Sequence, residues 1–391
     1  MEITRSKKAF WILSILSIGF LVMATGATSP ALASIAEAYP NIPFSIIVLI
    51  ATIPVLLLVP FSLISGKLAG TIVSFKNLTI IGVTLFLIGG VGPYFFNNFT
   101  LILIMRGIFG AGLGIISPLG NALILNLFEA KEAENLMGMG VVVGNIGGIA
   151  FQLLGGIFCA INWRFTFLTY LLGAVPLIIV ILFFPKLPLT AKAGNIKVKV
   201  PAIAYIWSTI YAILMLLVYP MLTGMSSLVL SNHYGTSAGA GIALTMFTIG
   251  GMIAGAVFGI VFRKLARFTI PVGVILTTIG FIFFVYGTNL TFFIIGATIV
   301  GIGFNLTGTA IMMRVGRSVP SEQTAFAMSI VMAFMSLGGF ISGFVFAFIE
   351  KTFSITSLRF PFMLSLLCFA AYVVIDLIII LKSSKSQNLS S

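Results

Sequence analysis

Ionisable side chains that could do chemistry are scarce in the apolar parts of this sequence. Arg106 is the sole basic residue well inside an apolar stretch, and Asp376 is the sole acid within one, near its end. The single histidine, His233, is expected in a surface loop. A proton relay normally needs a buried carboxylate or imidazole whose pKa lies near ambient pH. Arg106 is therefore the candidate coupling or substrate-binding charge, and Asp376 is a candidate titrating acid.

The depth of Arg106 leaves two interpretations open. A charged side chain inside a membrane span is costly unless it is paired or hydrated. Arg106 lies some five residues into its apolar stretch, so its stem could snorkel to the nearer membrane surface. In the other interpretation, the guanidinium faces a water-filled cavity between two halves of the protein.

Uncharged polar residues inside the apolar stretches could line a substrate cavity. Asn, Gln and Ser in membrane helices also cross-link neighbouring helices, each for roughly 1 kcal/mol, and we expect half of this set to do only that. The 37 Phe and 16 Met residues could form adaptable apolar walls around such a cavity. The polar candidates are Thr25, Thr28, Ser29, Asn121, Asn126, Asn145, Gln152, Asn305, Thr309 and Ser336.

Metal and cofactor chemistry is not indicated. The sequence has one histidine, no H-E-x-x-H motif and no paired carboxylates inside an apolar stretch. Cys159 and Cys368 both fall in apolar runs, so they are interpreted as small buried hydrophobic residues. We expect no metal, no cofactor and no enzymatic activity.

The elements that must position these residues are membrane-spanning helices. The chain has 391 residues, of which 60% are hydrophobic and 7% charged. A span needs about 20 apolar residues, and the first run is interpreted as a retained span. The composition predicts an all-α polytopic membrane protein with twelve spans, at roughly 10–33, 44–65, 77–96, 101–126, 137–159, 166–184, 202–228, 239–261, 270–286, 292–313, 325–348 and 358–381. The tail 382–391 is polar, and we expect it to be disordered.

Charge placement predicts the orientation of these spans. Seventeen of the 21 Lys and Arg residues fall in the termini and in the connections on one side, whereas Arg164, Lys351 and Arg359 fall on the other. Basic residues concentrate on the cytoplasmic side, so both termini are expected there. The net charge of +13 is then a topology signal and a contact for anionic lipid, not an indication of nucleic-acid binding.

Glycine spacing indicates two tandem halves. Gly110-x-Gly112 returns as Gly301-x-Gly303, and Gly147-Gly148 returns as Gly338-Gly339, each after 191 residues. The expected domains are an N-terminal six-helix bundle at 1–184, a cytoplasmic linker at 185–201, and a C-terminal six-helix bundle with a short polar tail at 202–391.

Glycines four residues apart also predict close helix packing. Gly140, Gly144 and Gly148 lie at this spacing and would present one small face of a helix. Such a face suits tight static packing, and it also suits helices that slide and rock, so both interpretations stay open.

Three motifs and the helix pattern resemble the major facilitator superfamily over essentially the whole chain. The run Arg106-x-x-x-Gly110-x-Gly112 is similar to the motif of the family's fourth helix. Gly66-Lys67-Leu68-Ala69-Gly70, followed by Lys76, is similar to the loop between its second and third helices. Asn162-Trp163-Arg164-Phe165 resembles the start of the sixth helix in bacterial efflux members. The resemblance is to the twelve-helix bacterial type, nearest the drug and metabolite efflux branch.

The resemblance implies two six-helix bundles that rock about a central cavity, with Arg106 at a position linked to proton or substrate coupling. Two positions depart from the family pattern. The family loop usually has an acid where this chain has Gly70, and the efflux branch usually has Gly-Pro where this chain has Gly144-Asn145. Both departures argue against proton-driven drug antiport.

The expected function is secondary transport of a small organic solute across the plasma membrane by alternating access, with efflux favoured by the resemblance. The alternative is uptake or exchange of a small polar or anionic metabolite, with Arg106 as its counter-charge. A membrane-embedded enzyme would need a cluster of reactive residues, and a receptor would normally need an output domain. We expect neither here. The expected partners are the solute, membrane lipids, and protons or a counter-solute, with the protein as a monomer.

Overall fold

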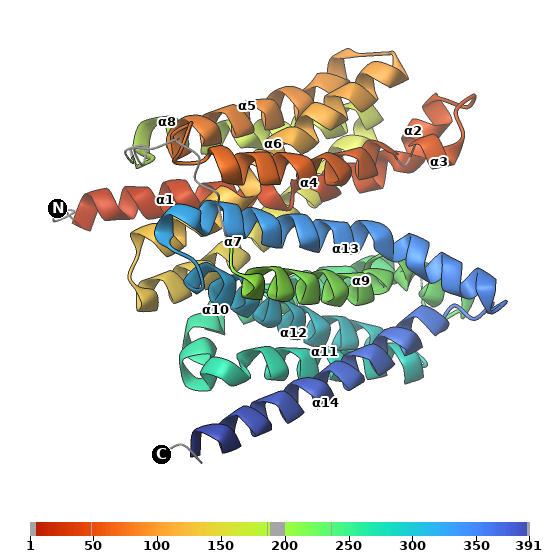
Figure 1. Ribbon diagram of the computed structural model, residues 1–391. Helices are drawn as coiled ribbons and strands as arrows, with labels where there is room; N and C mark the ends of the chain where they lie inside the picture. The colour runs from red at the N-terminus through yellow and green to blue at the C-terminus, as the bar shows by residue number, and fades with distance from the viewer. Residues whose placement is uncertain (1–4, 48, 186, 188–199, 236, 389–391) are drawn as a thin grey trace. The chain divides into compact units, whose positions relative to one another are not determined.

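The structure is a computed structural model that describes residues 5–47, 49–185, 187, 200–235 and 237–388 (Figure 1). Helices account for nearly all of these residues, and the β contact that they include is the isolated bridge between Ala69 and Val73. The predicted all-α class is therefore confirmed.

Eleven helical segments occupy the N-terminal part of the described chain. Polar caps start two of the long helices: the Ser74 hydroxyl accepts from the Asn77 N–H at 3.2 Å, and the Asn98 side chain accepts from the Thr100 N–H at 2.9 Å. The segments are α1 (Arg5–Val22), η1 (Ala24–Ala31), α2 (Leu32–Ala38), α3 (Phe44–Ile47), α4 (Leu49–Leu68), α5 (Phe75–Val91), η2 (Gly92–Phe95), α6 (Phe99–Leu127), α7 (Ala130–Ile161), η3 (Trp163–Gly173) and α8 (Ala174–Phe183).

The C-terminal part holds longer, less interrupted helices. They are α9 (Ala202–Ser231), α10 (Ser237–Leu265), η4 (Ala266–Phe268), α11 (Thr269–Tyr286), α12 (Leu290–Arg317), η5 (Ser321–Gln323), α13 (Thr324–Thr352) and α14 (Phe360–Asn388). The expectation of a disordered tail from residue 382 is wrong, because α14 continues to Asn388.

Membrane-crossing potential agrees with the predicted spans. Ten stretches among the described residues are long and apolar enough to cross a membrane, judged by length and composition. One of them, Gly239–Tyr286, contains both α10 and α11, and the apolar part of α14 forms a shorter helix, Phe360–Asp376. Each of the twelve predicted spans therefore falls on helix.

The first predicted span is not one continuous α-helix. It is interrupted after Val22 by the 3-10 segment η1, whose sequence Ala-Thr-Gly-Ala-Thr-Ser-Pro-Ala includes Gly26 and Pro30. Glycine weakens an α-helix and proline lacks a backbone donor, so both disfavour regular α-helix at this point. The interruption places Thr25 and Thr28 on irregular helix, as in the broken helices that line transporter sites.

The described chain forms two compact units. Unit 1 comprises residues 1–209 and 312–337, and unit 2 comprises residues 210–311 and 338–391. In unit 1, α4 and α5 pack on α6, and α7 packs on α1 and η1; in unit 2, α11 packs on α14. The predicted bundle bounds at 1–184 and 202–391 stay a prediction.

The 191-residue repeat is visible as a repeated helix contact. A Cβ on Gly112 would meet the Gly82 carbonyl oxygen at 2.6 Å and the Phe86 backbone. Within unit 2, a Cβ on Gly303 would meet the Gly273 carbonyl and the Thr277 nitrogen, the latter at 2.6 Å. Gly82 and Gly273, Phe86 and Thr277, and Gly112 and Gly303 are each 191 residues apart. The α5–α6 crossing of unit 1 is thus built like the α11–α12 crossing of unit 2.

Candidate functional site

Arg106 lies completely buried in unit 1, on helix α6. Its Nε donates a hydrogen bond to the carbonyl oxygen of Ile50 on α4, at 2.8 Å. Its guanidinium carbon lies 4.3 Å from the ring centroid of Phe109 and 5.2 Å from that of Tyr170. The side chain therefore does not snorkel to the surface of unit 1. Aromatic faces surround it instead.

These aromatic faces belong to one cluster gathered from four elements. Phe86 (α5), Phe109 (α6), Phe151 (α7) and Tyr170 (η3) are all fully buried. Ring centroids lie 4.9 Å apart for Phe86 and Phe109, 4.7 Å for Phe109 and Tyr170, and 5.9 Å for Phe151 and Tyr170. The negative face of an aromatic ring attracts a cation, most strongly where water is excluded. We name Arg106 with these four residues the arginine cage.

Polar atoms in this part of unit 1 are left without partners. Arg106 Nη1 and Nη2 and the Tyr170 hydroxyl are buried, and none has a hydrogen-bond partner among the described residues. The same holds for the hydroxyls of Thr28 and Thr169. A buried donor without an acceptor is costly, above all on a charged group. The cage can therefore supply charged donors to an anion, to water or to an acceptor group of a solute.

The other predicted cavity residues have varied surroundings. The Asn121 amide donates to the Met312 sulfur at 3.5 Å, and the Asn305 amide donates to the Gly301 carbonyl of its own helix at 2.9 Å. The Thr309 hydroxyl donates to the backbone carbonyl of Asn305, one turn earlier on its own helix, at 2.8 Å.

The remaining candidates differ mainly in burial. Asn145 is buried, and its amide nitrogen has no partner among the described residues. Ser336 is buried, Thr25 is half-buried and Gln152 is exposed. The side chain of Ser29 lies outside the part that the structure describes. Asp376 is half-buried in α14.

Besides Gly112, the predicted packing glycines of unit 1 make close approaches at three further positions. A Cβ on Gly110 would lie 2.5 Å from the Pro54 Cα, and one on Gly147 would collide with the Phe20 carbonyl. Gly66 faces the Ser329 side chain and the Ala325 carbonyl, the latter at 2.9 Å.

The glycines of helix α7 differ in how closely they approach α1. A Cβ on Gly144 would lie 3.4 Å from the Gly19 carbonyl oxygen, and one on Gly148 would lie 3.0 Å from the Met23 Cβ. A Cβ on Gly140 would have no neighbour within 4 Å. The tightest backbone contact of α7 thus runs through Gly147 and not through the face of Gly140, Gly144 and Gly148.

In unit 2, the repeated glycine pair also lies at helix contacts. A Cβ on Gly338 would collide with the Ala212 carbonyl of α9, and one on Gly339 would lie 3.1 Å from the Tyr219 ring. Gly338 thus makes a backbone contact of the same kind as Gly147, its counterpart 191 residues earlier.

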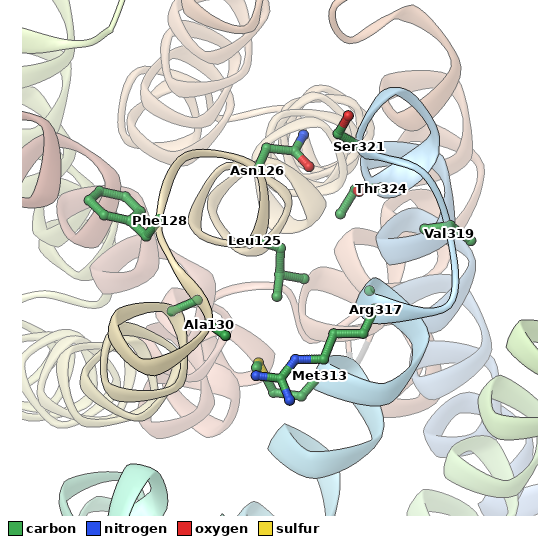
Figure 2. Close-up of a pocket in the computed structure, with 11 residues that line it drawn as sticks. Leu125, Asn126, Phe128, Ala130, Met313, Arg317, Val319, Ser321 and Thr324 are labelled. Carbon is green, nitrogen blue, oxygen red and sulfur yellow. The ribbon is translucent and has the colours of Figure 1, made fainter. Parts of the chain in front are cut away.

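A pocket of about 280 Å³ lies where α6 ends, α7 begins, α12 ends and α13 begins, all within unit 1 (Figure 2). Leu125 points into it, and Asn126 lines it with a buried side-chain oxygen that has no partner among the described residues. Arg317 also lines it and donates to the Glu134 carboxylate at 2.6 Å. The ion pair joins α7 to α12 beside the pocket, and no local sequence pattern indicates it because the two residues are 183 positions apart.

A family model described as Major Facilitator Superfamily matches residues 14–343 and, in a second alignment, residues 208–389. The relative "Multidrug transporter protein MdtP" of Bacillus subtilis (strain 168) is 28% identical over 199 residues. These residues make up 51% of this chain and 33% of that protein, so the match spans about a third of the relative's length.

Solved structures agree on the fold. The human organic anion transporter MFSD10 (TETRAN) superposes with a TM-score of 0.77 at 13% identity, covering 94% of this chain and 99% of that chain. The transporter FucP in its outward conformation gives a TM-score of 0.70 at 16% identity, covering 93% and 97%. At these identities the likeness concerns the fold alone, and the fold expected from the sequence is confirmed.

Proposed function

The chain belongs to the Major Facilitator Superfamily, and from that premise we propose that it is a secondary transporter of a small organic solute. It works by alternating access, in which two halves rock about a central site. Export is favoured over uptake because a relative that is 28% identical over 36% of this chain is named an "MFS-type efflux pump". A membrane-embedded enzyme or a receptor fits the family less well.

The observation that carries the proposal is the arginine cage. Arg106 is fully buried, and two of its three guanidinium nitrogens have no partner among the described residues. A charge that needed only to be stable would be bonded more completely, because unmet charged donors are expensive. Intramembrane ionisable residues commonly mark solute or ion pathways. Arg106 is therefore proposed as the coupling or substrate-binding charge.

The chemistry of the cage favours solutes that carry an acceptor. A carboxylate, a phosphate or a carbonyl can use the free guanidinium donors, whereas an organic cation is repelled by them. Uptake or exchange of a small anionic metabolite is for this reason the second candidate function. In both cases Arg106 supplies the positive charge that the bound group needs.

The cellular setting follows from charge placement. We place the protein in the plasma membrane, with both termini in the cytoplasm, because basic residues gather in the connections on that side. Protons or a counter-solute are the candidate coupling partners, and anionic lipids would contact the basic inner loops. A monomer is proposed.

Transport assays on the purified full chain in proteoliposomes test the function. A panel of metabolites and dyes is offered with and without an imposed pH gradient, in both directions. Accumulation of at least one compound that responds to the gradient, or exchanges with a preloaded compound, supports secondary transport. The matched control is Arg267→Ala, which removes an exposed arginine of unit 2 and should leave every rate unchanged. A panel without any transport above empty liposomes contradicts the proposal.

A further inference from the structure

One cluster in unit 1 joins three connections at the predicted outer ends of the helices. The Tyr39 hydroxyl, at the end of α2, donates to the Asn97 carbonyl oxygen at 2.8 Å. The Tyr39 ring packs edge-on against Phe99 at 5.4 Å and against Trp163 at 5.9 Å. Burial raises the pKa of Tyr39, while the charge of Arg164 and a side-chain hydrogen bond with it act in the opposite direction. The Arg164 guanidinium carbon lies 5.1 Å from the centroid of the Trp163 ring, so Tyr39 and Arg164 both contact Trp163.

A matching cluster lies in unit 2. Arg359 Nη2 donates to the Tyr234 hydroxyl and to the Gly287 carbonyl, both at 2.7 Å, and its Nη1 donates to the Val285 carbonyl at 2.5 Å. The Arg359 guanidinium carbon lies 5.5 Å from the Tyr234 ring centroid. The Tyr234 ring in turn lies 5.7 Å from that of Phe293.

The two clusters occupy corresponding positions in the two halves of the chain. Tyr39 and Tyr234 are 195 residues apart, and Arg164 and Arg359 are also 195 residues apart. Phe99 and Phe293 are 194 residues apart. In each half the tyrosine follows the first predicted span, the phenylalanine opens the fourth, and the arginine precedes the sixth or opens it.

We propose that these clusters are two outer clasps, each of which holds the three outer connections of its own half together so that the half moves as one body. The N-clasp is Tyr39, Phe99 and Arg164, and the C-clasp is Tyr234, Phe293 and Arg359. The role in transport rests on the proposed alternating-access function, in which each half must turn without coming apart. Arg164 and Arg359 are positioning residues that act through the connections they tie.

The clasps also explain two exceptions in the charge pattern. Arg164 and Arg359 are two of the three basic residues expected on the outer side, where basic residues are disfavoured. The Arg359 guanidinium donates three hydrogen bonds and lies over an aromatic ring. A planar guanidinium can satisfy this geometry, whereas the ammonium group of lysine cannot. The shape of arginine as well as its charge therefore fits position 359.

Hydrogen–deuterium exchange of the full chain in lipid nanodiscs tests the clasps without any solute. Arg164→Gln should speed exchange several-fold in peptides covering residues 39–43, 92–98 and 162–165, because the contact of the guanidinium with Trp163 is lost. Peptides covering 232–235, 285–290 and 354–359 should be unchanged. Arg359→Gln should give the reverse pattern, so that each variant is the control for the other.

The outcomes decide between a clasp and a merely local contact. Faster exchange in all three connections of the same half supports the proposal. Exchange that changes only beside the substituted arginine, that changes equally in both halves, or that does not change at all overturns it. If an arginine variant fails to fold, Tyr39→Phe and Tyr234→Phe, which delete a single hydroxyl, carry the same comparison.

Transport rates separate the clasps from the transport proposal itself. For a compound that the panel shows to be carried, Arg164→Gln and Arg359→Gln should lower the maximal rate about tenfold and leave half-saturation unchanged, because the clasps bind connections and not solute. The variants Arg164→Lys and Arg359→Lys should recover little of the lost maximal rate. The exchange result stands even when no compound is transported, so failure of the clasp and failure of the transport function are distinguishable. A raised half-saturation constant with an unchanged maximal rate overturns the positioning role.

Discussion

A small set of favourable contacts offsets part of the free-energy cost of burying Arg106. One hydrogen bond to a carbonyl and two aromatic faces stabilise the guanidinium. A hydrogen bond to a charged group contributes about 1.5–3 kcal/mol, and a desolvated cation–π contact about 2 kcal/mol. An isolated buried charge costs more than these contacts return. An acceptor delivered by a solute or an anion would therefore gain strongly from meeting Nη1 and Nη2.

Substitution of Arg106 is the first prediction at this scale. Arg106→Ala should eliminate or uncouple transport, and Arg106→Lys should recover little, because a single ammonium on a flexible stem cannot reproduce the planar five-donor fork. Asp376→Asn should keep most activity, since the residue lies in α14 toward its predicted cytoplasmic end. Initial rates at matched expression provide the comparison. Normal transport by Arg106→Ala together with an inactive Asp376→Asn would show that the functional charge lies in α14 and not at Arg106.

Removal of the Tyr170 hydroxyl should affect the stability of the protein and its transport rate in different ways. The hydroxyl is buried without a partner among the described residues, so Tyr170→Phe removes a desolvation cost and should leave the melting temperature equal or higher. If the hydroxyl meets the solute beside Arg106, the same variant should transport more slowly. Tyr170→Leu, which also deletes the aromatic face, should destabilise by about 2 kcal/mol or more. A lower melting temperature for Tyr170→Phe would show that the hydroxyl is already bonded.

Residue-level prediction from the sequence reached Arg106 but not its surroundings. Charge inside an apolar stretch is a local signal, so Arg106 could be recognised without a fold. The cage could not, because Phe86, Phe151 and Tyr170 come from three other elements and resemble many other aromatic residues of the chain. Asn305 shows the reverse limit: its polar type indicated a cavity, while its amide donates to its own helix.

At the scale of helices, glycine decides how closely neighbours approach. Gly112 and Gly303 let backbone meet backbone at equivalent crossings in the two units. Spacing in the sequence identified glycine-rich helices but not the face of each helix that contacts its neighbour. On α7, the spacing suggested one face through Gly140, Gly144 and Gly148 beside the repeated Gly147, and it is Gly147 that meets the Phe20 carbonyl most closely while Gly140 meets nothing within 4 Å. The direction of a neighbour is tertiary information that a periodic pattern does not contain.

Helix α7 offers a matched pair of substitutions. Gly147→Ala places a Cβ on the Phe20 carbonyl and should destabilise by about 1–3 kcal/mol, since backbone must move. Gly140→Ala meets nothing within 4 Å and should be neutral or stabilising by up to about 1 kcal/mol, because alanine favours helix. Thermal unfolding of both variants in the same lipid environment measures the difference. Equal melting temperatures would mean that α7 and α1 have room to separate.

Leucine on the same helix tests the sliding interpretation. Gly148→Leu must displace the Met23 side chain, whose Cβ would lie 3.0 Å from the first added carbon. In Gly144→Leu the first added carbon fits at 3.4 Å from the Gly19 carbonyl oxygen, and the rest of the leucine side chain must find room beside α1. Both should abolish transport although the protein still inserts, with Gly147→Leu the most severe. Transport rates divided by the amount inserted give the comparison. Unchanged transport by Gly144→Leu and Gly148→Leu would show that this face looks onto lipid.

For the whole molecule, composition and the family motifs were the strongest signals. Long apolar runs predicted helices that the structure contains, and the motifs around Arg106 and Gly66 pointed to the family that the family model matches. These signals are reliable because lipid forces backbone groups to bond within their own helix. The interruption at η1 and the extension of α14 to Asn388 depend on local backbone choices, which hydropathy does not report.

Orientation in the membrane is the last prediction, and it follows from seventeen basic residues on one side against three on the other. Cysteines are introduced singly into a Cys159→Ser, Cys368→Ser background and labelled in intact cells with a membrane-impermeant maleimide. Positions Asn97, His233 and Asn289 should react from outside. Position 265, and position 192 outside the described residues, should react only after the membrane is opened. Because all five positions are read in the same background, reversed labelling at either group would invert the topology and with it the outer placement of both clasps.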